Sequence, residues 1–272
     1  MELKNMPLGV FDSGLGGLTA LKELKAICPG EDIVYFGDTG RVPYGSKSAE
    51  TIKRYAVEDA RFLKSFGVKA ILVACGTVSA NAMNELKSSV GDGVMGVIEP
   101  TVDMADELTE KGGTVLILGT EATIASKAYE KLLAQKRPDI KFISQACPLF
   151  VPLAENGYTS KDNVAVKAIV NDYVGKYKDK ADTVILGCTH YPLLYNAIAD
   201  VLPNSKLISS GAAAAYGIKK YLEENNLSNQ SGGKISVYVS DKVRDFEKFA
   251  NAFLGESPNE YNKIDIEDFL NL

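Results

Sequence analysis

The chain has 272 residues, enough for one large core or two smaller domains, and its content of 46% hydrophobic and 24% charged residues is typical of a globular protein. The formal net charge of −5 argues against nucleic-acid binding, which needs a clustered basic surface. No apolar run approaches the ~20 residues that span a bilayer, and residues 1–7 lack the apolar region of a signal peptide, so we expect a cytoplasmic protein without membrane contact.

The first half of the chain alternates apolar runs with segments of helical periodicity. A glycine-rich turn follows the first run, and a polar loop, residues 37–45, follows the second. Ser48 is placed to cap the next helix and Gly67 to end it, and another helix is predicted over 77–87. Strands are predicted at 8–11, 32–36, 70–73 and 94–98, the last closed by Glu99 and Pro100.

The same order of elements then restarts. Strands are predicted at 114–118, 140–143, 184–186 and 206–208, with helices over 129–136 and 164–177 and from about 193. Cys-x-Thr segments at Cys75 and Cys188 recur at an offset of roughly 110 residues, which indicates a duplicated unit rather than a short-period repeat. A tail, with a helix over 212–222, a strand at 235–239 and a helix over 246–254, is expected to pack on the first half as an edge.

Strands that alternate with helices at this spacing predict parallel α/β sheets. We therefore expect an α/β fold of two pseudo-symmetric, doubly wound parallel-sheet domains with the active site between them. The first domain is predicted to comprise residues 1–97 and 210–272 and to contribute Cys75, and the second to comprise residues 98–209 and to contribute Cys188. Since ligands bind at the carboxyl ends of such strands, both cysteines are expected on one functional edge.

The glycine-rich turn from Asp12 to Thr19 directs backbone N–H groups at a helix N-terminus, where an anion is favoured. It does not match the G-x-G-x-x-G pattern of dinucleotide loops, and the carboxylate of Asp12 would repel phosphate. A tight strand-to-helix turn without a ligand is the simpler alternative.

The four cysteines are too few and too scattered for a disulfide framework. The chain contains no C-x-x-C motif and only one histidine, so a zinc site lacks its usual ligand spacing and no metal is expected. Cys28 and Cys147 are interpreted as buried structural residues. Cys75 and Cys188 each precede a predicted helix N-terminus, which is expected to lower the pKa of a thiol.

Two chemistries are compatible with these cysteines. Cys188 could be a covalent nucleophile with His190 as its base, but this leaves Cys75 unexplained. Alternatively, one thiolate removes a proton from a carbon and the other thiol returns a proton to the opposite face, which inverts a stereocentre. Asp12 and His190 could then set the protonation states of the two thiols, although an isolated histidine is often purely structural.

Six segments together make the chain resemble the glutamate racemase family. They follow one another in the family's order over nearly the whole chain: Asp12-Ser13-Gly14-x-Gly16-Gly17-Leu18, Gly37-Asp38-Thr39 with Pro43-Tyr44-Gly45, Ala74-Cys75-x-Thr77, Gly119-Thr120-x-x-Thr123, Ala146-Cys147-Pro148 and Gly187-Cys188-Thr189-His190-Tyr191-Pro192.

The resemblance implies a cofactor-independent isomerase that interconverts L- and D-glutamate for peptidoglycan, and hence for cell wall biogenesis and cell shape, with a homodimer as its assembly. It implies that Cys75 deprotonates D-glutamate and Cys188 deprotonates L-glutamate, assisted by Asp12 and His190. The positions implied to bind the substrate, or in the case of Glu155 to support the site, are Ser13, Pro43, Tyr44, Gly45, Gly76, Thr77, Thr120, Thr123, Thr189 and Glu155.

One position departs from the family pattern, because Gly76 stands where an asparagine is usual. Loss of an asparagine contact to the substrate costs on the order of 1 kcal/mol, so restoring the asparagine is expected to tighten binding. The departure keeps two alternatives open: racemisation of aspartate or another reaction of the superfamily, and a catalytically impaired amino-acid-binding protein.

Overall fold

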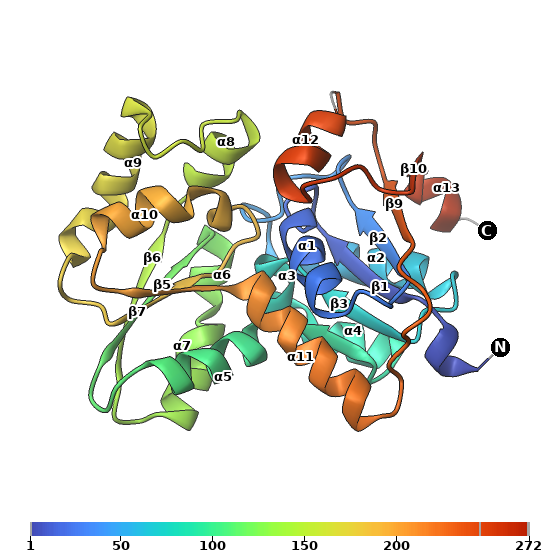
Figure 1. Cartoon of the computed structure of the whole chain (residues 1–272), viewed down its shortest axis with the longest axis horizontal. Helices are drawn as coiled ribbons and strands as arrows, with labels where there is room; N and C mark the ends of the chain where they lie inside the picture. Colours follow the sequence, from blue (N-terminus) through green and yellow to red (C-terminus); the bar gives the residue numbers. More distant parts are fainter. Residues whose placement is uncertain (1, 245, 271–272) are drawn as a thin grey trace.

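The computed structural model describes residues 2–244 and 246–270 and contains two parallel β-sheets (Figure 1). Sheet A holds β1 (Leu8–Asp12), β2 (Ile33–Gly37), β3 (Ala70–Val73), β4 (Val94–Gly96), β9 (Ile235–Val239) and β10 (Glu260–Lys263). Sheet B holds β5 (Thr114–Gly119), β6 (Lys141–Ala146), β7 (Thr183–Leu186) and β8 (Lys206–Ser209). These sheets confirm the predicted α/β fold class.

Helices connect successive strands. The α-helices are α1 (Leu18–Ile27), α2 (Ala49–Lys64), α3 (Gly76–Asn81), α4 (Met83–Val90), α5 (Ile98–Leu108), α6 (Glu121–Ser126), α7 (Ala128–Lys136), α8 (Phe150–Glu155), α9 (Val164–Val174), α10 (Tyr195–Val201), α11 (Ser210–Glu224), α12 (Phe246–Phe253) and α13 (Ile266–Leu270). Two of these helices, α5 and α11, connect one sheet to the other. Three short 3₁₀ segments are η1 (Leu3–Asn5), η2 (Gly175–Tyr177) and η3 (Tyr191–Leu194).

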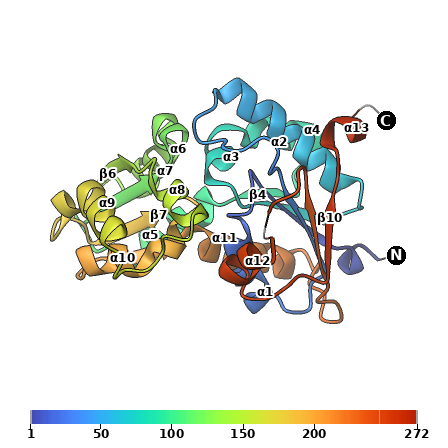
Figure 2. The ribbon, with the colours of Figure 1, turned by 90° about the horizontal axis from the view of Figure 1, so that it is seen from above.

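The strand orders of the two sheets repeat the same pattern. Sheet B runs β6-β5-β7-β8, and the first four strands of the chain run β2-β1-β3-β4 in sheet A. Thus β1 and β5 hold equivalent central places, as do β3 and β7, whose ends lead to the two Cys-x-Thr segments. The internal duplication predicted from the sequence is therefore present in the topology. Figures 1 and 2 show the two sheets in separate halves, with α11 near their boundary.

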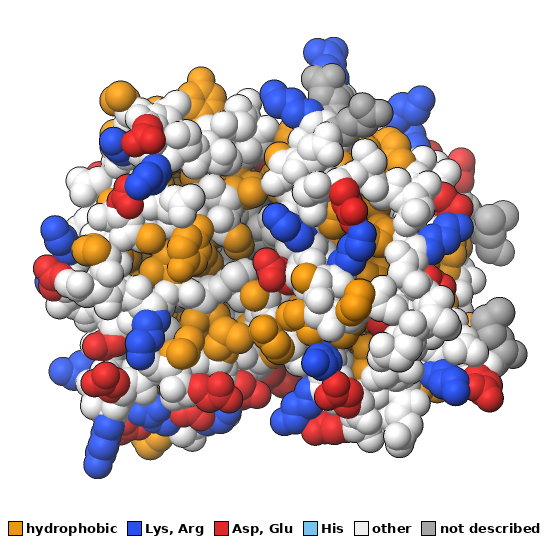
Figure 3. Space-filling view, in the orientation of Figure 1, with side chains coloured by type: hydrophobic (Ala, Val, Ile, Leu, Met, Phe, Trp, Pro, Cys, Tyr) orange, Lys and Arg blue, Asp and Glu red, His pale blue; other side chains and the backbone are white. Residues whose placement is uncertain are grey.

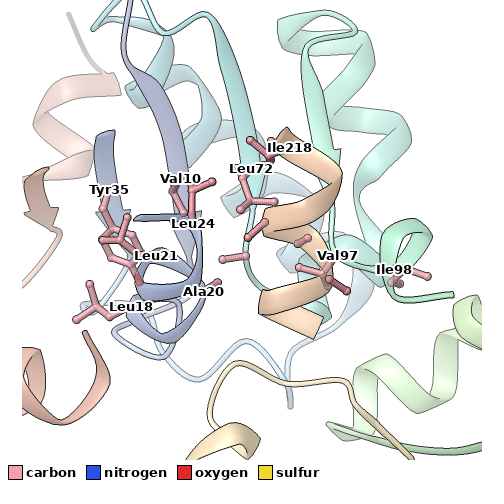
Figure 4. Packing of buried hydrophobic residues seen from close by; sticks show 14 of the residues in the cluster. Val10, Leu18, Ala20, Leu21, Leu24, Tyr35, Leu72, Val97, Ile98 and Ile218 are labelled. Atoms are coloured by element: carbon pink, nitrogen blue, oxygen red, sulfur yellow. The ribbon is translucent and has the colours of Figure 1, made fainter. Parts of the chain in front are cut away.

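The core of the first half forms because its central strands are apolar on both faces, as parallel strands covered by helices require. All five residues of β1 are buried, and α1 places Leu18, Leu21 and Leu24 on one face at helical spacing. Figure 4 shows side chains of α1 and α11 packed with strand residues such as Val10 and Leu72. This packing holds the carboxyl ends of β1 and β3 in a fixed relation.

Several predicted boundaries were wrong. Glu99 and Pro100 do not close β4 but lie in the first turn of α5, where proline is tolerated because the backbone N–H it lacks would have no helical partner. The helix predicted over 77–87 is divided at Ala82 into α3 and α4. The Ser48 cap is confirmed, since its side chain accepts a hydrogen bond from the Thr51 backbone N–H.

The tail packs on the edge of sheet A as expected, but it adds two strands rather than one. β9 pairs with β2, and β10 pairs with β9 as the outermost strand. On the face shown in Figure 3, Lys and Arg side chains are interspersed with Asp and Glu. None of the helices formed by residues 2–244 and 246–270 combines the length and apolar character that crossing a membrane requires.

Candidate active site

A cavity of about 310 Å³ lies where loops of the two halves meet. Its walls come from the carboxyl ends of β1, β2 and β3 on one side and of β5, β6 and β7 on the other. The lining residues are Ser13, Gly14, Val42, Pro43, Tyr44, Gly45, Ser46, Cys75, Gly76, Thr77, Thr120, Glu121, Cys147, Pro148, Val151, Pro152, Glu155, Cys188, Thr189 and His190. The site therefore occupies the edge predicted from the strand pattern.

All the site residues predicted from the sequence line this cavity except Asp12 and Thr123. Asp12 is fully buried behind the turn, where its Oδ2 accepts hydrogen bonds from the backbone N–H of Gly17 at 2.9 Å and of Gly14 at 3.3 Å. Burial raises the pKa of Asp12, against the charge of His190 and these N–H groups. Thr123 lies behind Thr120, with their hydroxyl oxygens 2.9 Å apart.

Cys75 occupies the position that immediately precedes α3 and is buried, with its Sγ 3.6 Å from Ser13 Oγ. Its pKa does not fall as the helix terminus alone predicts. Burial and the carboxylate of Asp12 raise the pKa of the Cys75 thiol to about 12, against weaker hydrogen bonds from Val78 and Ser13. The expectation of two activated thiols was therefore wrong for Cys75, which holds its proton at neutral pH.

Cys188 has a different environment. Its Sγ lies 3.9 Å from His190 Nδ1, and His190 Nε2 lies 3.2 Å from Glu155 Oε1. Burial by itself lowers the pKa of His190, but contacts with Cys188 and Glu155 outweigh burial and raise the pKa to about 10. The imidazole is therefore protonated at neutral pH, and it places a positive charge beside the Cys188 sulfur.

The loop around Tyr44 is held by a buried charged network that sequence reasoning missed. The Tyr44 hydroxyl donates to Asp38 and also lies 3.0 Å from Asp59 Oδ2. Arg41 contacts Asp38 at 2.6 Å, Asp59 at 2.9 Å and also Glu58. Because its hydroxyl is engaged in this way, Tyr44 offers the cavity its ring and backbone. Asp59 lies in α2, three residues after Ala56 and four before Leu63, so helical spacing places its carboxylate on the buried face, and this spacing was the available signal.

The two halves are joined around the cavity by polar contacts. The Thr77 and Thr120 hydroxyl oxygens are 3.0 Å apart, and the Thr19 hydroxyl donates to the Thr189 carbonyl at 2.8 Å. The Ala122 N–H donates to the carbonyl of Gly45 at 3.1 Å. These contacts hold the Cys75 and Cys188 turns at one cavity.

Several wall residues were not predicted from the sequence: Gly14, Val42, Ser46, Glu121, Cys147, Pro148, Val151 and Pro152. Most of them adjoin predicted site residues, so the motifs themselves were the available signal. Cys147 is buried in the core of the second half, as expected, but it also lines the cavity. From the tail, Phe253 packs edge-on against the His190 ring, with centroids 5.8 Å apart.

The arrangement can support acid–base chemistry at a small polar molecule. One buried thiol keeps its proton, the other lies beside a cation, and threonine and serine hydroxyls are available for carboxylates. Across residues 2–244 and 246–270, the structure contains no group of three or more His, Cys, Asp or Glu side chains placed to hold a metal ion.

Residues 17–216 match the profile of the Asp/Glu/Hydantoin racemase family. The chain belongs to that family, a class of enzymes that invert a stereocentre. Within this class it resembles glutamate racemases over nearly its whole length. It is 43% identical over 251 residues to the glutamate racemase of Aquifex aeolicus. The aligned region covers 92% of this chain and 95% of the relative.

Two further comparisons agree. The glutamate racemase of Geobacter metallireducens is 40% identical over 264 residues, covering 96% of this chain and 97% of the relative. A crystal structure of glutamate racemase from Francisella tularensis in complex with D-glutamate superposes with a TM-score of 0.90 at 38% identity, covering 97% of this chain and 99% of that chain.

Proposed function

We propose that the protein interconverts L- and D-glutamate by proton transfer between two cysteines at the α-carbon, without a cofactor. The observation that carries the proposal is that Cys75 and Cys188, from equivalent strands of a duplicated unit, line one cavity in different electrostatic environments. The choice of glutamate rests on the names of the similar proteins.

The surroundings of Cys75 and Cys188 give the two thiols different roles before L-glutamate reacts. Cys188, beside protonated His190, is the base that takes the α-proton of L-glutamate, so the C–H bond breaks and an S–H bond forms. Cys75, which holds its proton, then gives that proton to the opposite face of the carbanion, and its S–H bond breaks as the new C–H bond forms. The reverse reaction uses the same groups with exchanged roles.

Other residues have supporting parts in this proposal. Glu155 orients His190 and, after Cys188, contributes to its raised pKa, while Asp12 is a positioning residue behind Cys75. Hydroxyls such as those of Thr77 and Thr120 donate hydrogen bonds to substrate carboxylates and so stabilise the charge that develops on deprotonation.

The test is to incubate the purified protein with L- or D-glutamate, and separately with aspartate, without pyridoxal phosphate or metal, and to follow optical rotation. We expect loss of rotation with glutamate. Racemisation of aspartate alone would move the assignment to aspartate, and no change with either would refute the enzyme function.

The two-thiol mechanism is tested by Cys75→Ser and Cys188→Ser, with Cys28→Ser as the matched control. Serine is a far weaker base than a thiolate, so each site variant is expected to lose at least 10²-fold in kcat, whereas Cys28, which lies outside the cavity, is expected to be dispensable. Full activity of either site variant would contradict the mechanism.

The resemblance extends the proposal to the cell. We propose that the protein is a cytoplasmic homodimer that supplies D-glutamate for peptidoglycan. In each subunit, residues 1–97 and 210–272 form the first domain and residues 98–209 form the second. Light scattering of the purified protein measures its oligomeric state. Rescue of a bacterium that depends on added D-glutamate tests whether the protein produces D-glutamate in the cell. A monomer at micromolar concentration, or no rescue, would contradict these parts.

A further inference from the structure

Gly76 and Gly187 touch through their backbones at the point where the two halves meet. Gly76 directly follows Cys75, and Gly187 directly precedes Cys188. A Cβ atom added at Gly76 would lie 2.3 Å from the carbonyl oxygen of Gly187 and 3.3 Å from its carbonyl carbon. The obstacle is backbone rather than a flexible side chain, so relief would require one cysteine turn to move relative to the other.

Two further glycines of the first half meet the second half in the same way. A Cβ at Gly16 would lie 2.4 Å from the His190 ring, and one at Gly45 would lie 2.9 Å from the Cβ of Thr120. At Gly16 the obstacle is the His190 ring, and at Gly45 it is the Cβ of Thr120, which moves only together with its backbone. The contact at Gly76 is the shortest of the three and is made against backbone atoms.

We propose that Gly76 is a positioning residue whose missing side chain lets the Cys75 and Cys188 turns meet and thereby fixes the separation of the two thiols. This inference rests on the proposed two-thiol racemisation. An ordinary Cβ contact begins near 3.4 Å, so a side chain at residue 76 would push the turns apart by about 1 Å. A misplacement of this size costs on the order of 10²-fold in rate when reacting groups must be held in line.

The contact reverses the expectation drawn from the sequence. An asparagine at residue 76 was expected to tighten substrate binding, but its Cβ would meet the same carbonyl as that of an alanine. Gly76→Asn is thus expected to lower kcat rather than to improve binding.

The kinetic test compares Gly76→Ala with Gly93→Ala. Gly93 is the matched control, because its added Cβ would lie 3.5 Å from the nearest atom, an ordinary contact. We expect kcat of Gly76→Ala to fall on the order of 10²-fold in both directions with a smaller change in KM, and the isotope effect with α-deuterated glutamate to rise because proton transfer becomes slower. Gly93→Ala should match the unsubstituted protein in all three quantities.

A second readout does not depend on turnover. A short bis-alkylating reagent such as 1,3-dichloroacetone should bridge Cys75 and Cys188, detected by mass spectrometry of the linked peptides. We expect less bridging in Gly76→Ala than in Gly93→Ala. If Gly76→Ala does not fold, Gly45→Ala takes its place, because a Cβ at Gly45 would push against Thr120 across the same boundary between the two halves.

The outcomes separate the two proposals. Lack of racemisation by the unsubstituted protein refutes the proposed function, and the bridging comparison still decides the role of Gly76. Racemisation by the unsubstituted protein together with unchanged kcat, isotope effect and bridging in Gly76→Ala refutes the positioning role alone. Equal losses of kcat in Gly76→Ala and Gly93→Ala would also refute the positioning role, because the effect would then not be specific to the contact between the two cysteine turns.

Discussion

At the scale of single residues, the two thiols differ because their neighbours differ. Cys75 is buried near a carboxylate, whereas Cys188 lies beside an imidazole whose pKa is raised by contacts with Cys188 itself and with Glu155. The sequence placed both cysteines before a helix and so predicted similar activation. The helix terminus is the weaker influence at Cys75, because burial and a nearby negative charge both disfavour the thiolate.

Glu155→Gln tests the support of His190. The neutral amide removes one of the contacts that raise the pKa of His190 to about 10, so the imidazole should lose its proton at lower pH. Because the Glu155 side chain is 46% exposed, the high-pH limb of kcat for L-glutamate should move down by less than about one pH unit. Glu121→Gln, an acidic wall residue of the same cavity, is the control. An unmoved limb in Glu155→Gln would contradict the role of Glu155.

Asp59→Asn tests the network behind Tyr44. Burial, followed by the charge of Asp38, holds the pKa of Asp59 well above its ordinary value. A carboxyl with a raised folded-state pKa stabilises the fold below its unfolded pKa of about 4, and this stability is lost as pH rises toward the folded pKa. Asparagine does not titrate, so Asp59→Asn should gain in free energy of unfolding relative to the unsubstituted protein between pH 4 and pH 8.

Urea unfolding at several pH values measures this difference. Asp59→Ala is the companion variant, and it should destabilise the protein by about 2 kcal/mol because Arg41 and Tyr44 then lose a buried hydrogen-bond acceptor. A constant difference between Asp59→Asn and the unsubstituted protein over this pH range would contradict the assignment.

At the scale of elements, buried apolar strands and capped helices could be predicted from the sequence, but contacts between distant elements could not. β1, β3 and β7 and the cap of α2 at Ser48 follow from local patterns. The packing of α12 against His190 does not, because its signal is only an amphipathic helix far along the chain. The break at Ala82 and the start of α5 likewise depend on tertiary packing.

Phe253→Leu tests this contact of α12. The smaller side chain leaves the His190 ring less supported, and we expect a loss of about 1 kcal/mol in free energy of unfolding together with a severalfold lower kcat for L-glutamate. Phe249→Leu on the same helix is the control, since Phe249 contacts Phe253 and should affect stability without the same effect on kcat. Equal kinetic losses in both variants would show that the helix acts only through stability.

At the scale of the whole molecule, duplication explains both the fold and the site. Two units with the same strand order bring equivalent strand ends to one cavity, so the corresponding turn of each unit supplies a thiol. The repeat was visible in the sequence because both Cys-x-Thr segments follow apolar strands. How closely the halves approach was not visible, because the Gly76–Gly187 contact joins residues that only the folded structure brings together.

In the proposed mechanism, two different thiols exchange protons with opposite faces of one carbon. Conversion of L-glutamate in deuterium oxide, with both enantiomers analysed by mass spectrometry early in the reaction, tests this exchange. We expect deuterium at the α-carbon of the D-glutamate formed and hydrogen in the remaining L-glutamate. D-Glutamate that keeps the original hydrogen would contradict it, because a single base would then carry the proton from one face to the other.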